Sequence, residues 1–398
     1  MKEKMIMKGL YRNFPAFAPD YTGVSSLLFD ENAITVFLDP HGCNGQSLYY
    51  MDPRFEDFSR MPKSFSCGIR EKDAVFGLES LVEKKITKLL KDVTGDYIVL
   101  LGTPVPAMLG VDFRALSRKI EHLTNIPTFG IPTTGLCFYD EGQRMFFDHI
   151  LDWTESGANN FEPEKADVHI IGATPLDGWD YTSMNDYVSL LEDCGITDVS
   201  CWGQGNLLQK AKGIKNSRLN IAVSATSLHM VERLKQSYGT PYIMGYPIGS
   251  LMERYFKELI KAKVNIQTPP SLPERTFVNT DINGILILGD PINSCMLRNC
   301  LRMQFGISKV DIGFCFRPPS VCVQKNDFIF SEEYELKQTI SARQEYDLMI
   351  GDPLFKSFIP CKKYIDYPNI AVSGRLYASE IDRVFGKWGD AFIKKYIT

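Results

Sequence analysis

The sequence predicts an α/β protein of three similar units, each with a parallel sheet flanked by helices. Short apolar, β-branched runs alternate with longer amphipathic stretches along the chain, which is typical of parallel sheets. The alternation restarts twice, after a polar stretch at 155–165 and after a cluster of prolines at 269–273. We therefore expect domains at 1–160, 165–268 and 274–375, whose lengths fit the usual size of a domain.

Each unit has its own expected strands and helices. In the first unit, apolar runs predict strands at 33–38, 97–101 and 127–131, with helices at about 79–91, 113–123 and 139–150. In the second unit, strands are expected at 168–171, 219–223 and 240–244, with helices at about 180–193 and 226–238. In the third unit, strands are expected at 284–288 and 347–350, with helices at about 293–305 and 378–394. Residues 1–30 are proline-rich and are expected to be loop-like.

The most informative segment follows the first expected strand. Residues 39–46 read Asp-Pro-His-Gly-Cys-Asn-Gly-Gln, and the proline and glycines predict that the strand ends in a loop. His41 and Cys43 lie two residues apart in this loop, and Ser47–Tyr50 could open a helix after it. In open α/β sheets, ligands bind at such strand ends. An ordinary turn with an incidental cysteine is the alternative.

Charge and hydropathy limit the classes of partner. The formal net charge is −4, which gives no reason to expect nucleic acid as a partner. No apolar run approaches the roughly 20 residues that a membrane-spanning helix needs. Residues 1–7 contain an acid and lack the apolar centre of a signal peptide. We expect a cytoplasmic protein that binds neither nucleic acid nor membrane.

Ten cysteines are scattered along the chain, at 43, 67, 137, 194, 201, 295, 300, 315, 322 and 361. None forms the C-x2-C pair that is typical of zinc ribbons and ferredoxins. In a reducing compartment, most are expected to be small buried hydrophobic residues. Any metal site must therefore combine distant segments of the chain, or two chains.

Several blocks, in the same order, resemble the nitrogenase component 1 family. That family includes molybdenum–iron protein subunits, their cofactor-assembly scaffolds and several tetrapyrrole reductases. The resemblance covers most of the chain. The blocks are His41-Gly-Cys43, Glu71-Lys-Asp-Ala-Val-Phe-Gly77, Thr103–Phe113, Gly239-Thr-Pro-Tyr with Pro247-Ile-Gly249, and Asp347-Leu-Met-Ile-Gly351.

The resemblance implies three Rossmann-like domains, with a C-terminal helix at 376–398 packed back on the first. It also implies a homodimer or a pseudo-symmetric heterodimer, an iron–sulfur cluster at the interface and an ATP-dependent iron-protein partner that delivers electrons. Placed on this chain, it makes Cys43 and Cys67 the candidate metal ligands of a [4Fe–4S] cluster. The candidate cofactor-binding positions are the glycines of the same blocks, Gly42, Gly45 and Gly110.

Departures from the family pattern narrow the function. The family's first cluster cysteine falls at Ala16 or Phe17 and its third at Pro104, and none of these side chains can hold iron. Val231 stands where the molybdenum–iron cofactor needs a cysteine, so neither that cofactor nor dinitrogen reduction is expected. For Cys67, a buried turn cysteine is the alternative.

Two residues are candidates for catalysis. His41 lies beside the cysteine and is a candidate proton donor, with a backbone role of the His-Gly pair as the alternative. Gln143 falls where the family has a histidine that helps to position substrate. Arg54, close to the same loop in sequence, could contact an anionic ligand.

Two functions remain open from the sequence. In the first, an iron-protein-like ATPase passes electrons through the interface cluster to a small molecule, and the chain is a reductase. In the second, the chain is a non-catalytic protein of the same fold that binds or assembles a metal cluster or cofactor. The lost cysteines favour the second function, whereas the retained Cys43 loop and the block at 71–77 favour the first.

Overall fold

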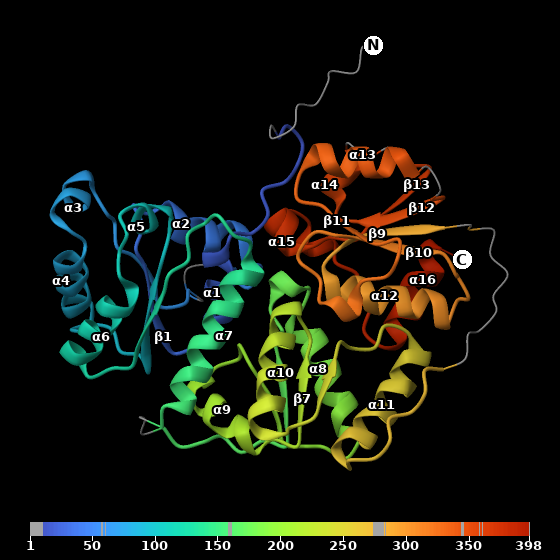
Figure 1. Cartoon of the computed structure of the whole chain (residues 1–398), viewed down its shortest axis with the longest axis horizontal. Coiled ribbons are helices and arrows are strands. Elements are labelled where there is room, and N and C mark those ends of the chain that lie inside the picture. Colours follow the sequence, from blue (N-terminus) through green and yellow to red (C-terminus); the bar gives the residue numbers. More distant parts are fainter. Residues whose placement is uncertain are drawn as a thin grey trace, which may run out of the picture.

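The computed structural model describes residues 11–56, 59, 61–157, 161–273, 282, 284–343, 346–357, 359 and 361–397. These residues form three parallel sheets that follow one another along the chain, and helices cover their faces (Figure 1). The predicted α/β class with parallel sheets is therefore confirmed. Within the described ranges, every helix is too short or too polar to cross a lipid bilayer.

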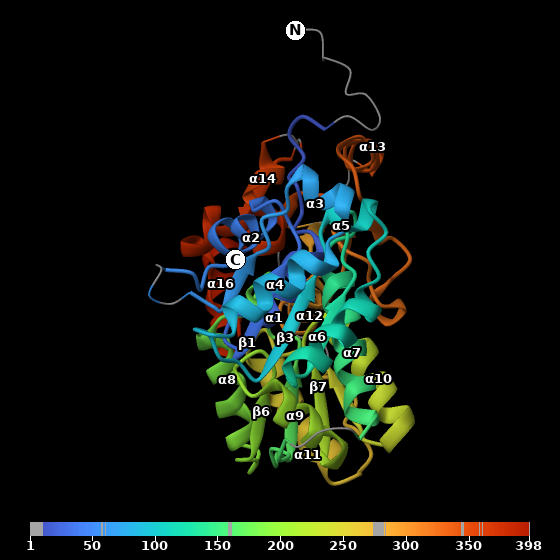
Figure 2. The ribbon, with the colours of Figure 1, turned by 90° about the vertical axis from the view of Figure 1, so that its left-hand side faces the viewer.

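The first sheet has the strand order β2-β1-β3-β4. Its strands are β1 (Ala33–Phe37), β2 (Ser64–Ser66), β3 (Tyr97–Leu101) and β4 (Thr128–Ile131). The helices of this unit are α1 (Asp20–Leu27), α2 (Gly42–Gly45), α3 (Glu71–Phe76), α4 (Glu79–Leu89), α5 (Pro104–Met108), α6 (Phe113–Thr124) and α7 (Tyr139–Glu155), with a π-helical turn η1 at Gln46–Met51. Figure 2 shows this unit from the side on which α4 lies.

The two faces of the first sheet have separate cores. Every residue of β1 and β3 is buried, which explains their continuous apolar runs. Val36 and Leu100 pack with α4 and α6, whereas Phe37 and Leu101 pack with α1 and α7. The N-terminal stretch that was expected to be loop-like contains α1, a helix buried along its whole length. Pro15 and Pro19 precede this helix and Gly23 lies within it, and these residues predict a loop when the sequence is considered without its packing.

The second sheet has the order β6-β5-β7-β8, and the third has the order β11-β10-β9-β12-β13. The second unit contains β5 (Val168–Ile171), β6 (Val199–Cys201), β7 (Leu219–Ala222), β8 (Tyr242–Met244), α8 (Tyr181–Glu192), α9 (Leu207–Gly213), α10 (Ala225–Tyr238) and α11 (Ser250–Val264), with 3₁₀ turns η3 (Pro175–Asp177) and η4 (Ile214–Asn216). The third contains β9 (Ile285–Gly289), β10 (Val310–Phe314), β11 (Phe328–Ile329), β12 (Leu348–Gly351), β13 (Lys363–Asp366), α12 (Pro291–Met303), α13 (Glu333–Arg343), α14 (Pro353–Lys356) and α15 (Ile370–Ser373), with 3₁₀ turns η5 (Ser320–Cys322) and η6 (Gly374–Glu380).

The C-terminal segment differs from the expectation for 376–398. The predicted single helix is two pieces, η6 and α16 (Lys387–Tyr396). Phe392 and Ile393 of α16 are buried with side chains of the second and third sheets, and the helix packs against α11. The apolar face of α16 is thus covered close to the third sheet, so this helix does not return to the first unit. The other piece, η6, contacts η1 of the first unit.

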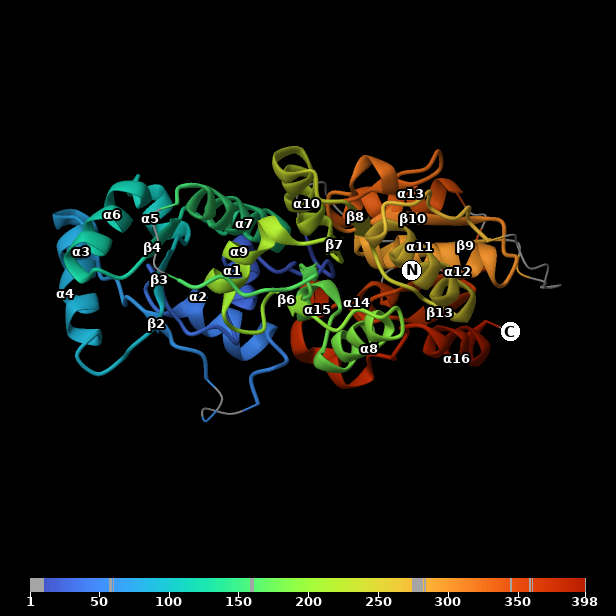
Figure 3. The ribbon, with the colours of Figure 1, turned by 90° about the horizontal axis from the view of Figure 1, so that it is seen from below.

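Apolar cores also join the three sheets to one another. One core combines side chains of the first and second units, a second combines the first and third, and a third combines the second and third. In Figure 3, α10 lies beside α7. Helix α15 contacts η3 of the second unit. The division of the chain into separate domains at the expected boundaries stays a prediction.

Candidate functional site

The Cys43 loop lies at the carboxyl edge of the first sheet, directly after β1. The helix after this strand begins at Gly42 rather than at Ser47, so Cys43 lies in the short helix α2 instead of a loop. Asp39, which is buried, fixes the turn because its carboxylate accepts a hydrogen bond of 3.1 Å from the Asn44 amide. The strand and this cap together hold Cys43 at the edge of the sheet.

The other candidates in this region are exposed or have free space around them. His41 precedes α2 with φ of 114°, a costly conformation for a residue other than glycine, and its side chain is exposed. A β-carbon at Gly42 or Gly110 would touch nothing within 4 Å, and one at Gly45 would make ordinary contact with a tyrosine ring. In the isolated chain, no close approach requires glycine at these three positions.

Cys43 is half-buried and lies beside a tyrosine hydroxyl. Tyr21 donates a hydrogen bond of 2.8 Å to Gln46 Oε1, and its hydroxyl also lies against the Cys43 thiol. Burial raises the pKa of the Cys43 thiol, and the carboxylates of Asp39 and Asp20 raise it further, although the Tyr21 hydroxyl opposes them. The free thiol is therefore protonated at neutral pH, and a metal ion must displace that proton to bind.

Cys67 does not join Cys43. It follows β2 and packs in the core between the sheet and α4, whereas Cys43 packs against the core on the opposite face. Only 1% of Cys67 is exposed, and burial raises the pKa of its thiol to about 11. In this conformation Cys67 is a buried cysteine after a strand, as in the alternative to metal binding given above. Its sulfur cannot reach a second chain.

Cys137 is a second thiol at the carboxyl edge of the first sheet that the sequence did not single out. It is exposed and lies in the loop between β4 and α7. Its carbonyl accepts a hydrogen bond of 3.0 Å from the amide of Asp20, the residue next to Tyr21. The Asp20 carboxylate in turn accepts hydrogen bonds from the amides of Thr134 (2.8 Å) and Gly135 (2.7 Å). One pair of adjacent residues, Asp20 and Tyr21, therefore anchors the segments of both cysteines.

Large apolar side chains are exposed along this same edge. They are Val75 and Phe76 of α3, Met108 of α5 and Leu136 of the loop after β4, and 88% of Phe76 and 87% of Leu136 are exposed. Figure 1 shows α2, α3 and α5 at one end of the first sheet. Exposed apolar side chains that gather at one end of a sheet indicate a surface for a partner.

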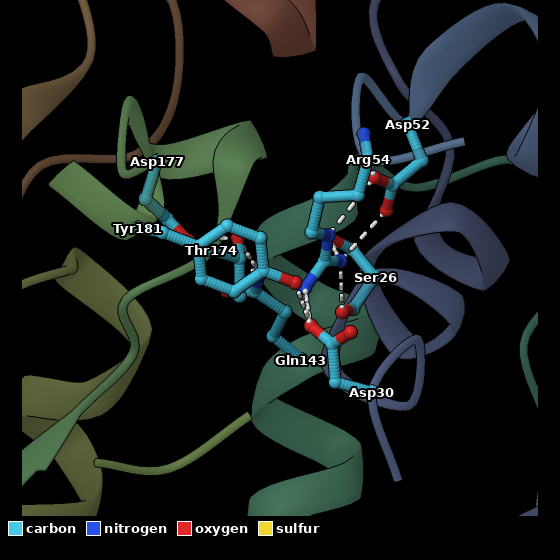
Figure 4. A network of polar contacts seen from close by, with 8 residues as sticks. All are labelled: Ser26, Asp30, Asp52, Arg54, Gln143, Thr174, Asp177 and Tyr181. Carbon is cyan, nitrogen blue, oxygen red and sulfur yellow. Dashed lines mark hydrogen bonds and ion pairs between the residues drawn. The ribbon is translucent and has the colours of Figure 1, made fainter. Parts of the chain in front are cut away.

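Gln143, the second catalytic candidate, is fully buried in a polar network. Its Nε2 donates to Thr174 Oγ1 and Asp177 Oδ2, both at 3.2 Å (Figure 4). Its Oε1 accepts from Thr226 Oγ1 at 2.8 Å. Thr226 separates it from an open cleft of about 290 Å³ between α7, α10 and the loop after β10. Because its polar atoms are all engaged, Gln143 joins α7 to the second unit and does not reach a substrate in this conformation.

A pair of buried carboxyl groups completes this network. The Tyr139 hydroxyl lies 3.0 Å from Asp177 Oδ1 and 3.4 Å from Asp290 Oδ2 and bridges the two. Burial raises the pKa of Asp177 to about 8, with a further increase from Asp290, and burial raises the pKa of Asp290 to about 6. At neutral pH the pair therefore carries about one negative charge.

Arg54 is not available to an anionic ligand. Its guanidinium pairs with Asp52 at 2.7 Å and Asp30 at 3.2 Å and donates to the Ser26 carbonyl at 2.6 Å (Figure 4). Tyr181, from the second unit, donates to the same Asp30 oxygen at 2.6 Å. Arg54 therefore joins the first and second units. The expected contact with an anionic ligand is not available in this conformation, because Asp30, Asp52 and Ser26 engage the guanidinium.

The described residues of one chain do not complete a metal site. In these ranges, no group of three or more histidine, cysteine, aspartate or glutamate side chains is placed to hold a metal ion. Iron–sulfur clusters of the [4Fe–4S] type need four ligands, usually thiolates. The thiols at the exposed edge, Cys43 and Cys137, fit such a cluster only if a second chain supplies further ligands.

Comparison with known sequences gives distant relatives. The chain is 24% identical over 181 residues to the nitrogenase iron-molybdenum cofactor biosynthesis protein NifE of Nostoc sp., over 45% of this chain and 37% of that protein. It is 22% identical to NifE of Bradyrhizobium diazoefficiens, over 60% of this chain and 43% of that protein. It is 25% identical to the nitrogenase molybdenum-iron protein alpha chain of Methanothermococcus thermolithotrophicus, over 45% of this chain and 39% of that protein. The chain thus spans about two fifths of the length of these relatives.

Comparison with solved structures supports the fold, and a family model covers most of the chain. A structure titled "Nitrogenase Cp1 at pH 6.5" aligns with a TM-score of 0.70 at 14% identity, over 98% of this chain and 93% of that one. At this identity the likeness concerns the fold alone. Residues 27–274 match the model of the nitrogenase component 1 type oxidoreductases. The chain therefore belongs to the nitrogenase component 1 type oxidoreductase family.

Proposed function

We propose that this chain is a cytoplasmic nitrogenase-like reductase that receives electrons from an ATP-dependent iron-protein partner and passes them to a small molecule other than dinitrogen. Two copies would share an iron–sulfur cluster of the [4Fe–4S] type at their interface. Membership of the component 1 family supports the electron-transfer role and the partner. The absence of a cysteine at Val231 supports a substrate other than dinitrogen.

The position of Cys43 is the observation that carries this proposal. Its thiol lies at an edge where Phe76 and Leu136 expose apolar surface that a second copy would cover. In a two-fold dimer the same edge of each copy meets, so two Cys43 thiols would approach each other. We propose Cys137, rather than Cys67, for the remaining pair of ligands, because Cys137 is exposed at this edge.

A bound iron–sulfur cluster supplies one-electron transfer at a potential set by its ligands, burial and hydrogen bonds. The residues of this chain would supply thiolates and keep water away from them through the apolar side chains of the edge. The Tyr21 hydroxyl lies against the Cys43 thiol and donates its proton to Gln46 Oε1; redirection of that proton to the sulfur would stabilise the thiolate. His41, exposed beside α2, stays a candidate proton donor.

A second candidate function is assembly of a metal cluster or cofactor. Two of the relatives described above are named as cofactor biosynthesis proteins. In this chain Gln143 also has no free polar atom for a substrate, which favours a role without catalysis. Such a protein would hold its cluster only until an acceptor takes it.

The experiment is anaerobic purification with iron and sulfide analysis of the wild type, Cys43→Ala, Cys137→Ala and Cys361→Ala. We expect about four irons per dimer in the wild type and in Cys361→Ala, which removes a half-buried thiol of the third unit. Cys43→Ala and Cys137→Ala should each lose most of the iron. Incubation with an apo-ferredoxin then separates the two functions, because a reductase keeps its cluster and an assembly protein transfers it.

Two results would contradict the proposal. If the wild type binds no iron after reconstitution with iron and sulfide, electron transfer through an interface cluster is excluded. If Cys43→Ala keeps its full iron content, the cluster, where present, is held elsewhere. Retention of iron by Cys137→Ala alone would remove only that residue from the ligand set.

A further inference from the structure

Two free thiols meet in the third unit. Cys295 lies in the first half of α12, and Cys322 ends the short turn η5 that follows β10. Helix α12 packs against both β10 and η5, and Figure 1 shows α12 beside β10. Neither cysteine is among the candidate ligands of the iron–sulfur cluster, so a role for this pair does not depend on the proposed function.

The two thiols are in direct contact. The Cys322 thiol is placed to hydrogen-bond Cys295 Sγ, which in turn donates to the Cys322 carbonyl oxygen at 3.6 Å. Only 5% of Cys295 and 2% of Cys322 are exposed, so the surrounding core holds the two side chains together. The sulfurs of a disulfide are about 2 Å apart, and thiols that already touch reach this separation by small rotations about their side-chain bonds.

A buried guanidinium lies against the same pair. Nη2 of Arg298, three residues after Cys295 in α12, donates to Cys295 Sγ at 3.6 Å and to the Cys322 carbonyl oxygen at 2.6 Å. Its Nη1 pairs with Asp327 at 2.7 Å, which fixes the guanidinium. The hydrogen bond from Cys322 and the charge of Arg298 lower the pKa of the Cys295 thiol, although burial opposes them. Cys295 is therefore the better nucleophile of the two, because the thiolate is the reactive form of cysteine.

Only a thin layer of chain separates the pair from solvent. Val321 and Val323, on either side of Cys322, are both exposed, and η5 is a single turn of three residues. A short turn at the surface opens more readily than a strand or a long helix, because few contacts hold it. A small neutral oxidant such as hydrogen peroxide therefore has a route to the thiols.

The turn that carries Cys322 belongs to a loop that also borders a cleft. The Cys322 amide donates to the Pro319 carbonyl oxygen at 2.9 Å. Arg317, Pro318 and Pro319 line the open cleft of about 290 Å³ between α7, α10 and this loop. A covalent bond between Cys322 and α12 would thus fasten the loop that forms one wall of the cleft.

We propose that Cys295 and Cys322 form a disulfide when the protein meets a hydroperoxide. The Cys295 thiolate attacks one oxygen of hydrogen peroxide and becomes a sulfenic acid; the O–O bond breaks, and the hydroxide that leaves takes up the proton that Cys295 has lost. The Cys322 sulfur then attacks the sulfenic sulfur. The S–S bond forms, the S–O bond breaks, and the hydroxyl leaves as water with the Cys322 proton. Two thiols and one hydrogen peroxide give one disulfide and two water molecules.

The test exposes the reduced, anaerobically purified chain to hydrogen peroxide, blocks the remaining thiols with N-ethylmaleimide and maps the linked peptides by mass spectrometry. The variants are Cys322→Ala and Cys300→Ala. Cys300 is the matched control, because it is a fully buried cysteine of the same helix. We expect the Cys295–Cys322 link in the wild type and in Cys300→Ala, its loss on treatment with dithiothreitol, and no link to Cys295 in Cys322→Ala.

Urea unfolding tests whether the link fastens the loop. The disulfide should raise the urea midpoint of the peroxide-treated wild type by about 0.5 to 1 M over that of the reduced wild type. Cys322→Ala, treated in the same way, should show no increase, which controls for oxidation at other residues. The proposal is overturned if peroxide leaves the two cysteines unlinked in the wild type, if Cys295 pairs as readily with another cysteine in Cys322→Ala, or if the linked and reduced wild types unfold at the same midpoint.

Discussion

Asp177 illustrates how burial changes a single side chain. In the folded chain burial raises its pKa to about 8, whereas the ordinary value is 3.8. Between these two values the folded state binds one proton more than the unfolded state, so a rise in pH favours unfolding. This group therefore lowers the free energy of unfolding as the pH rises across that window, and its contribution to stability is complete only below the lower value.

We expect Asp177→Asn, which resembles the protonated carboxyl, to remove this contribution. Urea unfolding at roughly pH 5, 6 and 7 should show a smaller loss of stability with pH in the variant than in the wild type. Asp92→Asn, at an exposed position, is the matched control and should keep the wild-type slope. An identical slope in Asp177→Asn and wild type would show that Asp177 is ionised in the folded chain.

At the scale of elements, α1 and α7 pack unusually closely because a glycine lies on each. A β-carbon at Gly142 of α7 would lie 1.9 Å from the Asp20 carbonyl oxygen, and one at Gly23 of α1 would lie 2.0 Å from the Tyr139 carbonyl oxygen. Backbone cannot yield as a flexible side chain can, so the helices would have to separate. This contact also positions Asp20, Tyr21 and Tyr139, which reach both the Cys43 edge and the buried carboxyl pair.

Gly142→Ala should therefore destabilise the fold by about 2 kcal/mol or more, as measured by urea unfolding. Gly42→Ala is the control, because a β-carbon there touches nothing within 4 Å and the residue lies in α2. It should change the stability by less than about 1 kcal/mol. Equal stabilities of the two variants would mean that α1 and α7 can move apart at little cost.

At the scale of the whole molecule, the exposed apolar edge of the first sheet predicts a dimer. Phe76→Asp places a charge where a second copy would bury a phenyl ring. We therefore expect the dissociation constant of the dimer to rise at least about tenfold. Ile266→Asp replaces an apolar residue that is 91% exposed but lies at the end of α11, far from this edge in sequence. In anaerobic analytical ultracentrifugation, Phe76→Asp should sediment as a monomer and Ile266→Asp as a dimer. If both variants sediment as dimers, this edge is excluded as the interface.

Several features of the candidate site could not be read from the sequence. Cys67 follows a strand just as Cys43 does, yet the two sulfurs lie on opposite faces of the sheet. The family pattern made Gln143 a catalytic candidate. In the structure, Thr174 and Thr226 of the second unit form hydrogen bonds with its side-chain amide. No motif in the sequence around Cys137 indicates a role for this residue. Its segment is connected to that of Cys43 through Asp20 and Tyr21 of α1, and this connection exists only in the folded chain.

The sequence by itself determined the parallel α/β architecture, since β-branched runs and helical periodicity reflect local backbone preferences and burial on both faces of each sheet. It also determined that a thiol follows β1, because proline and glycine end a strand through their own backbone restrictions. The tertiary structure decided which side chains share an edge, a cleft or a core. Those relations join residues far apart in the chain, and they depend on strand order, helix packing and the face to which each side chain turns.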